Sequence, residues 1–257
     1  MTPALSISRL EKTYASGTVA LKGATLEIPE GDFFALLGPN GAGKTTIIGI
    51  VTGLVTKSAG TVSVFGHDID RSPEQAKAQI GLVGQEINFN PFEKPIDIVT
   101  NQAGYYGIAR SVALPRARRL LEDLGLADKM TQRAMTLSGG MKRRLMIARA
   151  LVHQPRFLIL DEPTAGVDVE LRRGMWNYLR QLAGSGVTIL LTTHYLEEAE
   201  RLCRNVAIIN RGEIVVSGSM EEVLAMHDAS AQAGGGDGGG KLEEIFLRLT
   251  RTEQHQS

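Results

Sequence analysis

The stretch Gly38-Pro-Asn-Gly-Ala-Gly-Lys-Thr45 is the part of this sequence that decides its fold. It fits the pattern G-x-x-x-x-G-K-[ST] and follows the continuously apolar run Phe33–Leu37, which is typical of a central strand. Glycines let the backbone curl so that successive N–H groups point at phosphate oxygens. A helix expected from about Lys44 to Leu54 presents its positive end to the same anion. The sequence therefore predicts a phosphate-binding loop made of Gly38, Pro39, Asn40, Gly41, Ala42, Gly43, Lys44, Thr45 and Thr46.

The side chains of this loop indicate a magnesium-bound nucleoside triphosphate. Lys44 supplies a point charge to the β- and γ-phosphates, and the hydroxyl of Thr45 can ligate Mg²⁺. A glycine-rich turn without function could show the same letters. The strand before the turn and the helix after it favour the functional interpretation, with ATP and Mg²⁺ as the expected ligands.

Two carboxylates follow a second apolar run, Phe157–Leu160. Parallel α/β sheets bind ligands at the carboxyl ends of their strands, so Asp161 and Glu162 are expected at the same edge as the phosphate loop. We predict that Asp161 holds Mg²⁺ and that Glu162 is the general base for the attacking water. Without the upstream loop, an Asp-Glu pair would be interpreted as a loop start or a helix cap.

Composition narrows the class of protein. The 257 residues carry no formal net charge, which argues against nucleic acid as the partner. The single cysteine, Cys203, cannot form an internal disulfide and is expected to be a packing residue in a reducing setting. The apolar runs Phe157–Leu160 and Val187–Leu191 are far shorter than the roughly 20 residues of a membrane-spanning helix. Any membrane pathway would have to come from another polypeptide.

The order of patterns predicts an α/β fold with a mainly parallel sheet, an antiparallel β subdomain and an inserted helical subdomain. Alternating segments at Leu5–Leu10 and Val19–Ile28 suit antiparallel strands, and residues 86–151 have a helical character. Within that region a helix is expected over Pro115–Leu124. We divide the chain into a domain at 1–230, a glycine-rich linker at 231–240, and a short helix and tail at 241–257.

The stretch Leu137-Ser-Gly-Gly-Met141 resembles the LSGGQ signature of ATP-binding cassettes, the ATPase domains of ABC transporters. It lies shortly before the two carboxylates, as it does in that family. The resemblance implies a RecA-like P-loop NTPase core. It also implies that Ser138, Gly139 and Gly140 bind the γ-phosphate held by a second cassette, so that two subunits sandwich ATP head to tail. One departure is Met141, where glutamine is usual, and we expect activity to survive it.

The same resemblance assigns roles to further residues, each in the expected order along the chain. It implies an aromatic that stacks on adenine, a glutamine that senses Mg²⁺ and the attacking water, a carboxylate at the dimer seam, and a histidine that contacts the γ-phosphate. These residues are Tyr14, Gln85, Asp168 and His194, respectively.

The implied function is ATP hydrolysis in a cassette dimer, most simply a homodimer, that powers transport through a separate membrane permease. Residues 101–107, 138–144 and 242–250 are similar to the ATPase subunits of ABC-2-type exporters of drugs, lipids or polysaccharides. The subunit would then be cytoplasmic and held at the inner face of the cell membrane by its permease. The alternatives are the ATPase subunit of an ABC importer and an ABC ATPase that acts as a switch without transport.

Two further features are open to more than one interpretation. Phe89 and Phe92 either line a groove for a permease helix or fill the core of the helical region. A group of basic residues on helices either forms a solvated face, which is the expectation, or an anion-binding site; they are Arg116, Arg118, Arg119, Lys142, Arg143 and Arg144.

Overall fold

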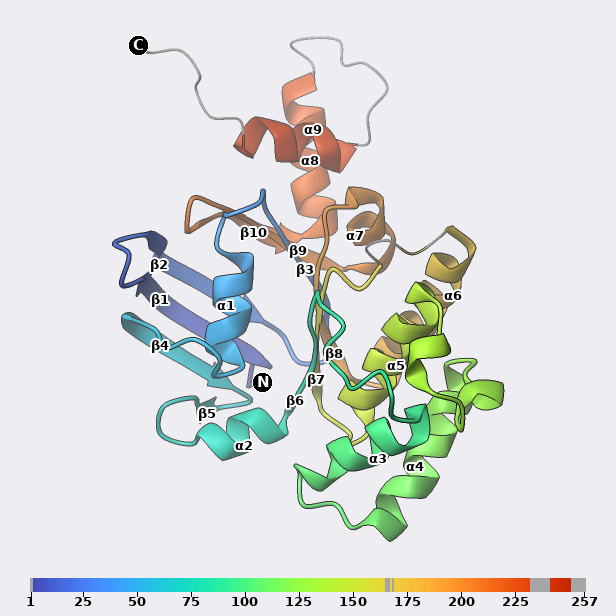
Figure 1. The fold of residues 1–257 in the computed structure, drawn as a ribbon. Helices are drawn as coiled ribbons and strands as arrows, with labels where there is room; N and C mark the ends of the chain where they lie inside the picture. Colours follow the sequence, from blue (N-terminus) through green and yellow to red (C-terminus); the bar gives the residue numbers. More distant parts are fainter. Residues whose placement is uncertain (1, 165–166, 168, 232–240, 251–257) are drawn as a thin grey trace. The chain divides into compact units, whose positions relative to one another are not determined.

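The computed structural model describes residues 2–164, 167, 169–231 and 241–250 of the chain. These residues form two compact units (Figure 1). The first contains residues 1–77 and 190–257, and the second contains residues 78–189. The chain returns from the second unit to the first within strand β8 (Thr188–Thr192).

An antiparallel sheet opens the first unit. Its strand order is β2-β1-β4-β5, and the bounds are β1 Leu5–Thr13, β2 Val19–Ile28, β4 Ala59–Val64 and β5 His67–Asp68. The alternating burial of β2 matches the alternation of its sequence, so the predicted half-buried antiparallel strands are confirmed. Strand β4 ends at Val64. Phe65 cannot continue it because its φ of 46° lies in the left-handed region.

Strand β3 (Phe33–Leu37) is buried at every residue, as its continuous apolar sequence predicts. It pairs in parallel with β9 (Asn205–Asn210), which forms a hairpin with β10 (Glu213–Ser219). Helix α1 (Lys44–Val51) follows the phosphate loop and ends earlier than the expected Leu54. Gly53, with a φ of 74°, closes the helix, since the N–H groups of Leu54 and Val55 both donate to the carbonyl of Gly49.

The first unit contains further helices (Figure 1). They are α2 (Pro73–Ala78, whose last residue belongs to the second unit), α7 (Leu196–Leu202), α8 (Met220–Ala231) and α9 (Lys241–Thr250). Helix α9 contacts α7, α8 and β9, and it buries Leu242 and Ile245. Most of the predicted linker, residues 232–240, lies outside the described residues, and the predicted boundaries at 230 and 240 stay predictions.

The second unit joins a short parallel strand pair to helices. Strand β6 (Ile80–Val83) pairs in parallel with β7 (Phe157–Asp161), which extends one residue beyond the predicted strand and includes Asp161. The helical elements are α3 Pro95–Gly104, α4 Arg110–Asp123, α5 Gly139–Leu151 and α6 Val169–Gly184, with single turns at Ala127–Lys129 and Ala134–Thr136.

Helix α4 begins earlier than expected. It begins at Arg110, so Pro115 lies inside the helix instead of opening it. A proline removes the bond to the carbonyl four residues earlier, which here belongs to Ser111 in the first turn. Since only that one bond is lost, the helix continues through Pro115. Gly125, with a φ of 66°, follows the last turn as predicted.

Candidate functional site

The phosphate loop lies in the first unit, between β3 and α1, and its glycines are required by the backbone. Gly41 and Gly43 have φ angles of 78° and 117°, where other residues are strained. A Cβ at Gly38 would overlap the carbonyl oxygen of Ile209, and one at Gly43 would lie 2.8 Å from Leu21. These glycines are therefore required by the left-handed backbone and by close packing of the loop against Ile209 and Leu21.

Lys44, the first residue of α1, is buried with 8% exposure. Its ammonium donates to the carbonyl oxygens of Gly38 at 2.6 Å and Pro39 at 3.1 Å. Two carbonyl oxygens of the loop therefore bind the lysine ammonium at the positive end of α1. This is the arrangement that a triphosphate-binding loop requires.

Tyr14, predicted to stack on adenine, lies beside this loop. Its hydroxyl is 3.2 Å from the hydroxyl oxygen of Thr46, and the ammonium of Lys12 lies 4.8 Å from the centre of its ring. The aromatic ring and the phosphate loop are thus brought together across 32 positions of sequence.

His194 is exposed and follows β8 in a turn fixed by a buried hydrogen bond. The Thr193 hydroxyl donates to the carboxyl of Glu198 at 2.7 Å and accepts the N–H of Tyr195 at 3.0 Å. Glu198 has no exposed surface and lies on α7. Thr193 and Glu198 are site-supporting residues that the sequence reasoning missed. In the sequence, two features could have pointed to them. Thr193 directly precedes the predicted histidine, and Glu198 lies on the same helix face as apolar residues.

The predicted carboxylates and Gln85 lie together in the second unit. Asp161 is buried at the end of β7, and Glu162 follows it with a φ of 50°. Such a left-handed conformation is strained for a glutamate and is found where a site demands it. The side-chain amide of Gln85 donates to the Glu162 carboxylate at 3.5 Å, the long end of hydrogen-bond distances. The structure thus brings Gln85 and Glu162 together across 77 positions.

The expectation that Arg143 lies on a solvated face is wrong. Its side chain is only 6% exposed, and its guanidinium donates to the carbonyls of Gly84 at 2.7 Å and Gln85 at 2.8 Å. Position 143 lies three and four residues before the buried Met146 and Ile147, which places it on the inward face of α5. That periodicity could have identified it. Its neighbour Arg144 is half-buried and donates to the carbonyl of Leu124, so it too departs from the expected solvated face.

Burial lowers the pKa of Arg143, while the nearby negative charges of Asp161 and Glu162 act to raise it. An arginine nevertheless stays protonated at any physiological pH. A fixed positive charge therefore lies close to the two carboxylates.

Ser138 caps α5, since its hydroxyl oxygen accepts the N–H of Met141 at 3.3 Å. Gly139 and Gly140 form the first turn behind it. A Cβ at Gly140 would lie 2.8 Å from a methyl group of Leu171, so this glycine is required for packing against α6. Asp168, predicted at the dimer seam, lies outside the described residues.

The residues predicted to hold Mg²⁺ are Thr45, Gln85 and Asp161, and all of them offer oxygen ligands, which suit this hard cation. Among the described residues there is no group of three histidine, cysteine or acidic side chains that could hold a metal.

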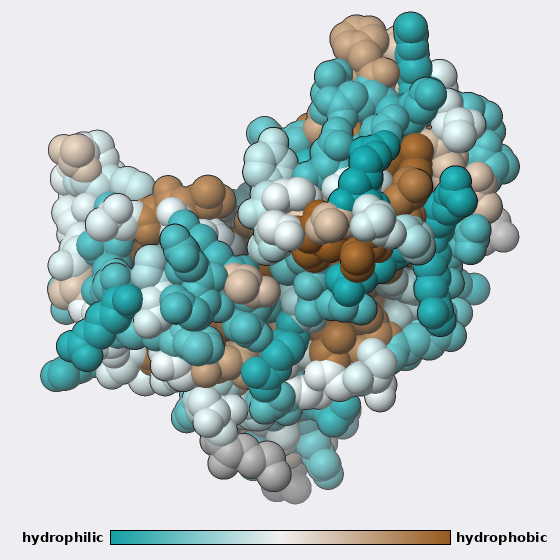
Figure 2. All heavy atoms as spheres, turned by 90° about the horizontal axis from the view of Figure 1, so that it is seen from below, coloured by the Kyte–Doolittle hydropathy of each residue, from teal (hydrophilic) through white to brown (hydrophobic). Residues whose placement is uncertain are grey.

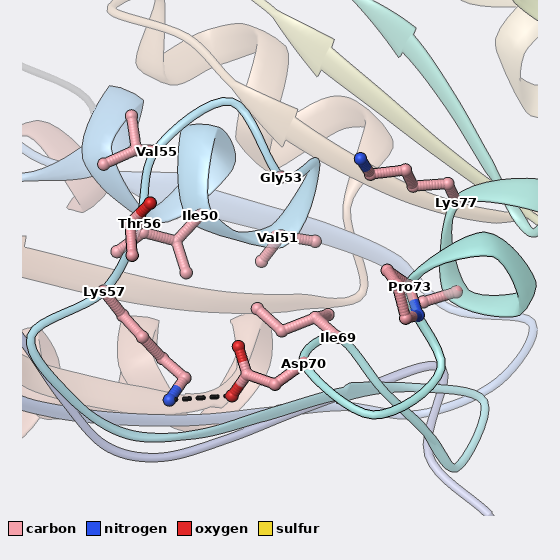
Figure 3. Close-up of a pocket in the computed structure, with 11 residues that line it drawn as sticks. Ile50, Val51, Gly53, Val55, Thr56, Lys57, Ile69, Asp70, Pro73 and Lys77 are labelled. Carbon is pink, nitrogen blue, oxygen red and sulfur yellow. Dashed lines mark ion pairs between the residues drawn. The ribbon is translucent and has the colours of Figure 1, made fainter.

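A cavity of about 170 Å³ lies at the other end of α1, at its carboxyl end (Figure 3). Its lining includes Ile50, Val51 and Ile69, and Lys57 forms a 2.9 Å ion pair with Asp70 at its edge. None of the predicted site residues lines this cavity. It is therefore separate from the phosphate loop.

Comparison with known proteins agrees with this geometry. The ABC transporter family model matches residues 21–165. The chain is 38% identical to the linearmycin resistance ATP-binding protein LnrL of Bacillus subtilis, over 86% of this chain and 71% of the relative. It is 40% identical to a Nod factor export ATP-binding protein I of Paraburkholderia xenovorans, over 86% of this chain and 73% of the relative. It is 36% identical to the daunorubicin/doxorubicin resistance ATP-binding protein DrrA of Streptomyces peucetius, over 90% and 73% of the respective chains.

Solved structures agree as well. An ATP-binding subunit of an ABC transporter superposes with a TM-score of 0.84 at 26% identity, covering 96% of this chain and all of that one. A dimeric ATP-binding cassette in a post-hydrolysis state bound to ADP and Pi gives a TM-score of 0.76 at 26% identity, covering 84% of this chain and 98% of that one. The predicted fold class, a P-loop NTPase with an antiparallel sheet and added helices, is confirmed. The chain belongs to the ABC transporter family and is one of its ATP-hydrolysing, ATP-binding subunits.

Proposed function

We propose that Glu162 accepts the proton of the water that attacks the γ-phosphate of ATP, and that Gln85 orients this water. The observation that carries the proposal is the contact between the Gln85 amide and a Glu162 carboxylate held by a strained backbone. Lys44 binds the β- and γ-phosphates, Tyr14 stacks on the adenine, and His194 contacts the γ-phosphate from its fixed turn. Thr45, Asp161 and Gln85 would hold Mg²⁺, which would supply positive charge to neutralise the phosphates.

The second ATP-binding surface of the subunit is the start of α5. Ser138 caps this helix, and Gly139 and Gly140 lie in its first turn, where N–H groups and the helix dipole attract an anion. We assign this surface to the γ-phosphate bound by a second copy of the chain, with Asp168 at the seam. ATP would then close a head-to-tail homodimer, and hydrolysis would open it.

We further propose that the ATPase serves an exporter. The relatives named above are described as export or drug-resistance ATP-binding proteins, which favours export over import or a switch without transport. No helix within the described residues is long and apolar enough to cross a membrane. A separate permease would supply the pathway and hold the subunit at the cytoplasmic face of the membrane.

The permease is expected to contact apolar side chains of the second unit. Phe92 is 65% exposed and Phe89 is half-buried, so the interpretation that both fill the core is wrong. Met135, also exposed, lies beside Phe92 because its N–H donates to the carbonyl of Pro91. Figure 2 shows brown, hydrophobic patches among hydrophilic side chains on the face that it draws.

Glu162→Gln tests the catalytic assignment. The amide keeps the size of the side chain but cannot take a proton, so hydrolysis should fall by at least about 100-fold while ATP still binds. In this variant ATP should produce a lasting dimer, measured by gel filtration with Mg-ATP. Glu197→Gln, at an exposed glutamate of α7, is the matched control and should hydrolyse ATP normally. Unchanged turnover in Glu162→Gln would remove Glu162 from the catalytic role.

Phe92→Ser tests the docking assignment. A substitution at this exposed position should leave the melting temperature unchanged, and co-purification with the permease should fall. Leu54→Ser, at a similarly exposed apolar residue of the first unit, should retain the permease. Equal retention by both variants would contradict docking through Phe92.

A further inference from the structure

Helix α5 holds the segment that contains Gln85 through two arginines. Arg143 donates one guanidinium nitrogen to the carbonyl of Gly84 and the other to that of Gln85. Arg149, further along the same helix, donates to the backbone carbonyl of Asn88 at 3.0 Å and to its side-chain oxygen at 2.5 Å. Residues 84–88 leave β6 without regular secondary structure, so these bonds are a major constraint on their path.

The geometry at Arg143 requires an arginine. A guanidinium presents two parallel N–H donors in a rigid plane, which matches two successive carbonyl oxygens, whereas a lysine ammonium is a single point of charge. Burial makes this charge costly, and the attraction of Asp161 and Glu162 offsets part of the cost. The arginine thus binds the backbone of Gln85 and feels the charges of the two carboxylates at the end of β7, Asp161 and Glu162.

We propose that Arg143, supported by Arg149, is a positioning residue for ATP hydrolysis that acts through Gln85. It fixes the backbone of Gln85 so that the side-chain amide reaches Glu162, and it touches neither ATP nor the attacking water. This proposal rests on the catalytic roles proposed above for Gln85 and Glu162.

Arg143 lies on the helix that also carries the proposed contact with the partner subunit. The same helix begins at Ser138, which is proposed to bind the ATP of the partner subunit. The two arginines therefore bond the Gln85 segment to α5. The segment belongs to the ATP site of its own subunit, whereas Ser138 at the start of α5 is proposed to bind the ATP of the partner subunit.

A mutant cycle on the purified subunit tests the proposal. The four proteins are wild type, Arg143→Gln, Gln85→Ala and the double variant, and the measurement is the turnover number for Mg-ATP. Arg143→Gln should lower turnover about 10-fold when Gln85 is present, with little change in the KM for ATP, because the phosphate loop is intact. In the Gln85→Ala background the same change should lower turnover less than about 2-fold, since the side chain that Arg143 positions is gone.

Arg144→Gln is the matched control. Arg144 is adjacent on α5 but donates to the carbonyl of Leu124, so its loss should affect turnover equally in both backgrounds. Equal effects of Arg143→Gln in the two backgrounds, or no effect in either, would overturn the proposal. A purely structural role predicts equal effects, because loss of folded protein does not depend on residue 85.

Arg143→Lys keeps the test decisive if the glutamine variant does not fold. The lysine retains the charge and one donor, so it should recover part of the turnover when Gln85 is present and none in the Gln85→Ala background. Full activity of Arg143→Lys would also overturn the requirement for the guanidinium fork. If the wild-type subunit itself lacked ATPase activity, the proposed function would fail before the cycle began, and the two failures are therefore distinguishable.

Discussion

Thr193→Val removes the hydrogen bond that fixes the turn carrying His194. The Thr193 hydroxyl donates to the carboxyl of Glu198 at 2.7 Å, and Glu198 is fully buried. Valine has the same shape but no donor, so the carboxyl loses a partner that water cannot readily replace. The N–H of Tyr195 loses its acceptor at the same time.

The magnitude follows from these two bonds. A hydrogen bond to a carboxylate contributes about 1.5–3 kcal/mol, and a partly buried backbone bond contributes about 1 kcal/mol. The unfolding free energy should therefore fall by about 3 kcal/mol. For a chain of this length each kcal/mol shifts the melting temperature by about 2–4 °C, which gives a loss of roughly 6–12 °C.

Two control variants sharpen the measurement, which is thermal unfolding followed by circular dichroism. Glu198→Gln keeps an oxygen that can accept the threonine hydroxyl, so it should lose less stability than Thr193→Val. Thr61→Val, on an exposed position of β4, should change the unfolding free energy by no more than about 0.5 kcal/mol. ATP turnover of Thr193→Val, measured well below its melting temperature, should fall because His194 is less firmly placed.

A melting temperature of Thr193→Val within about 2 °C of the wild type would contradict the expected loss of stability. Such a result would mean that the turn is held by other contacts and that the buried bond is not its main constraint. A normal melting temperature combined with reduced turnover would point instead to a direct role of Thr193 in the ATP site.

Two other predictions concern the phosphate loop and the pH dependence of stability. Gly38→Ala should reduce the unfolding free energy by about 1–3 kcal/mol and weaken ATP binding, measured by calorimetry, because the new Cβ would overlap the carbonyl oxygen of Ile209. Gly174→Ala on α6, where the added Cβ meets nothing within 4 Å, is its control and should not be destabilised. Burial lowers the pKa of His153 below its usual 6.5, so its contribution to stability is complete above pH 6.5 and is lost as the pH falls below that value. Denaturant unfolding of His153→Gln should therefore lose less stability between about pH 7 and pH 5 than the wild type, and parallel profiles would contradict this.

The local elements that carry the candidate site residues could be predicted from sequence because local patterns encode them. The run Phe33–Leu37 and the glycines after it specify a strand, a turn and a helix over a short span, and the structure has all three. The capped helix at Ser138 and the strand before Asp161 are equally local, since a capping hydroxyl and a continuous apolar run act within a few residues. The roles of the individual site residues remain predictions from family resemblance.

Only the tertiary structure decided which partners the distant residues have. The bonds from Arg143 to Gly84 and Gln85 join positions 59 and 58 residues apart, and no local pattern specifies them. The sequence alone also did not decide whether Phe92 is exposed, because an aromatic side chain suits both a core and a binding surface. Periodicity shows which face of a helix is buried, but the identity of the group against that face depends on how the elements pack. Sequence thus determined the phosphate loop and its strand and helix, whereas folding decided that a buried arginine, and not a solvated one, holds the glutamine segment in place.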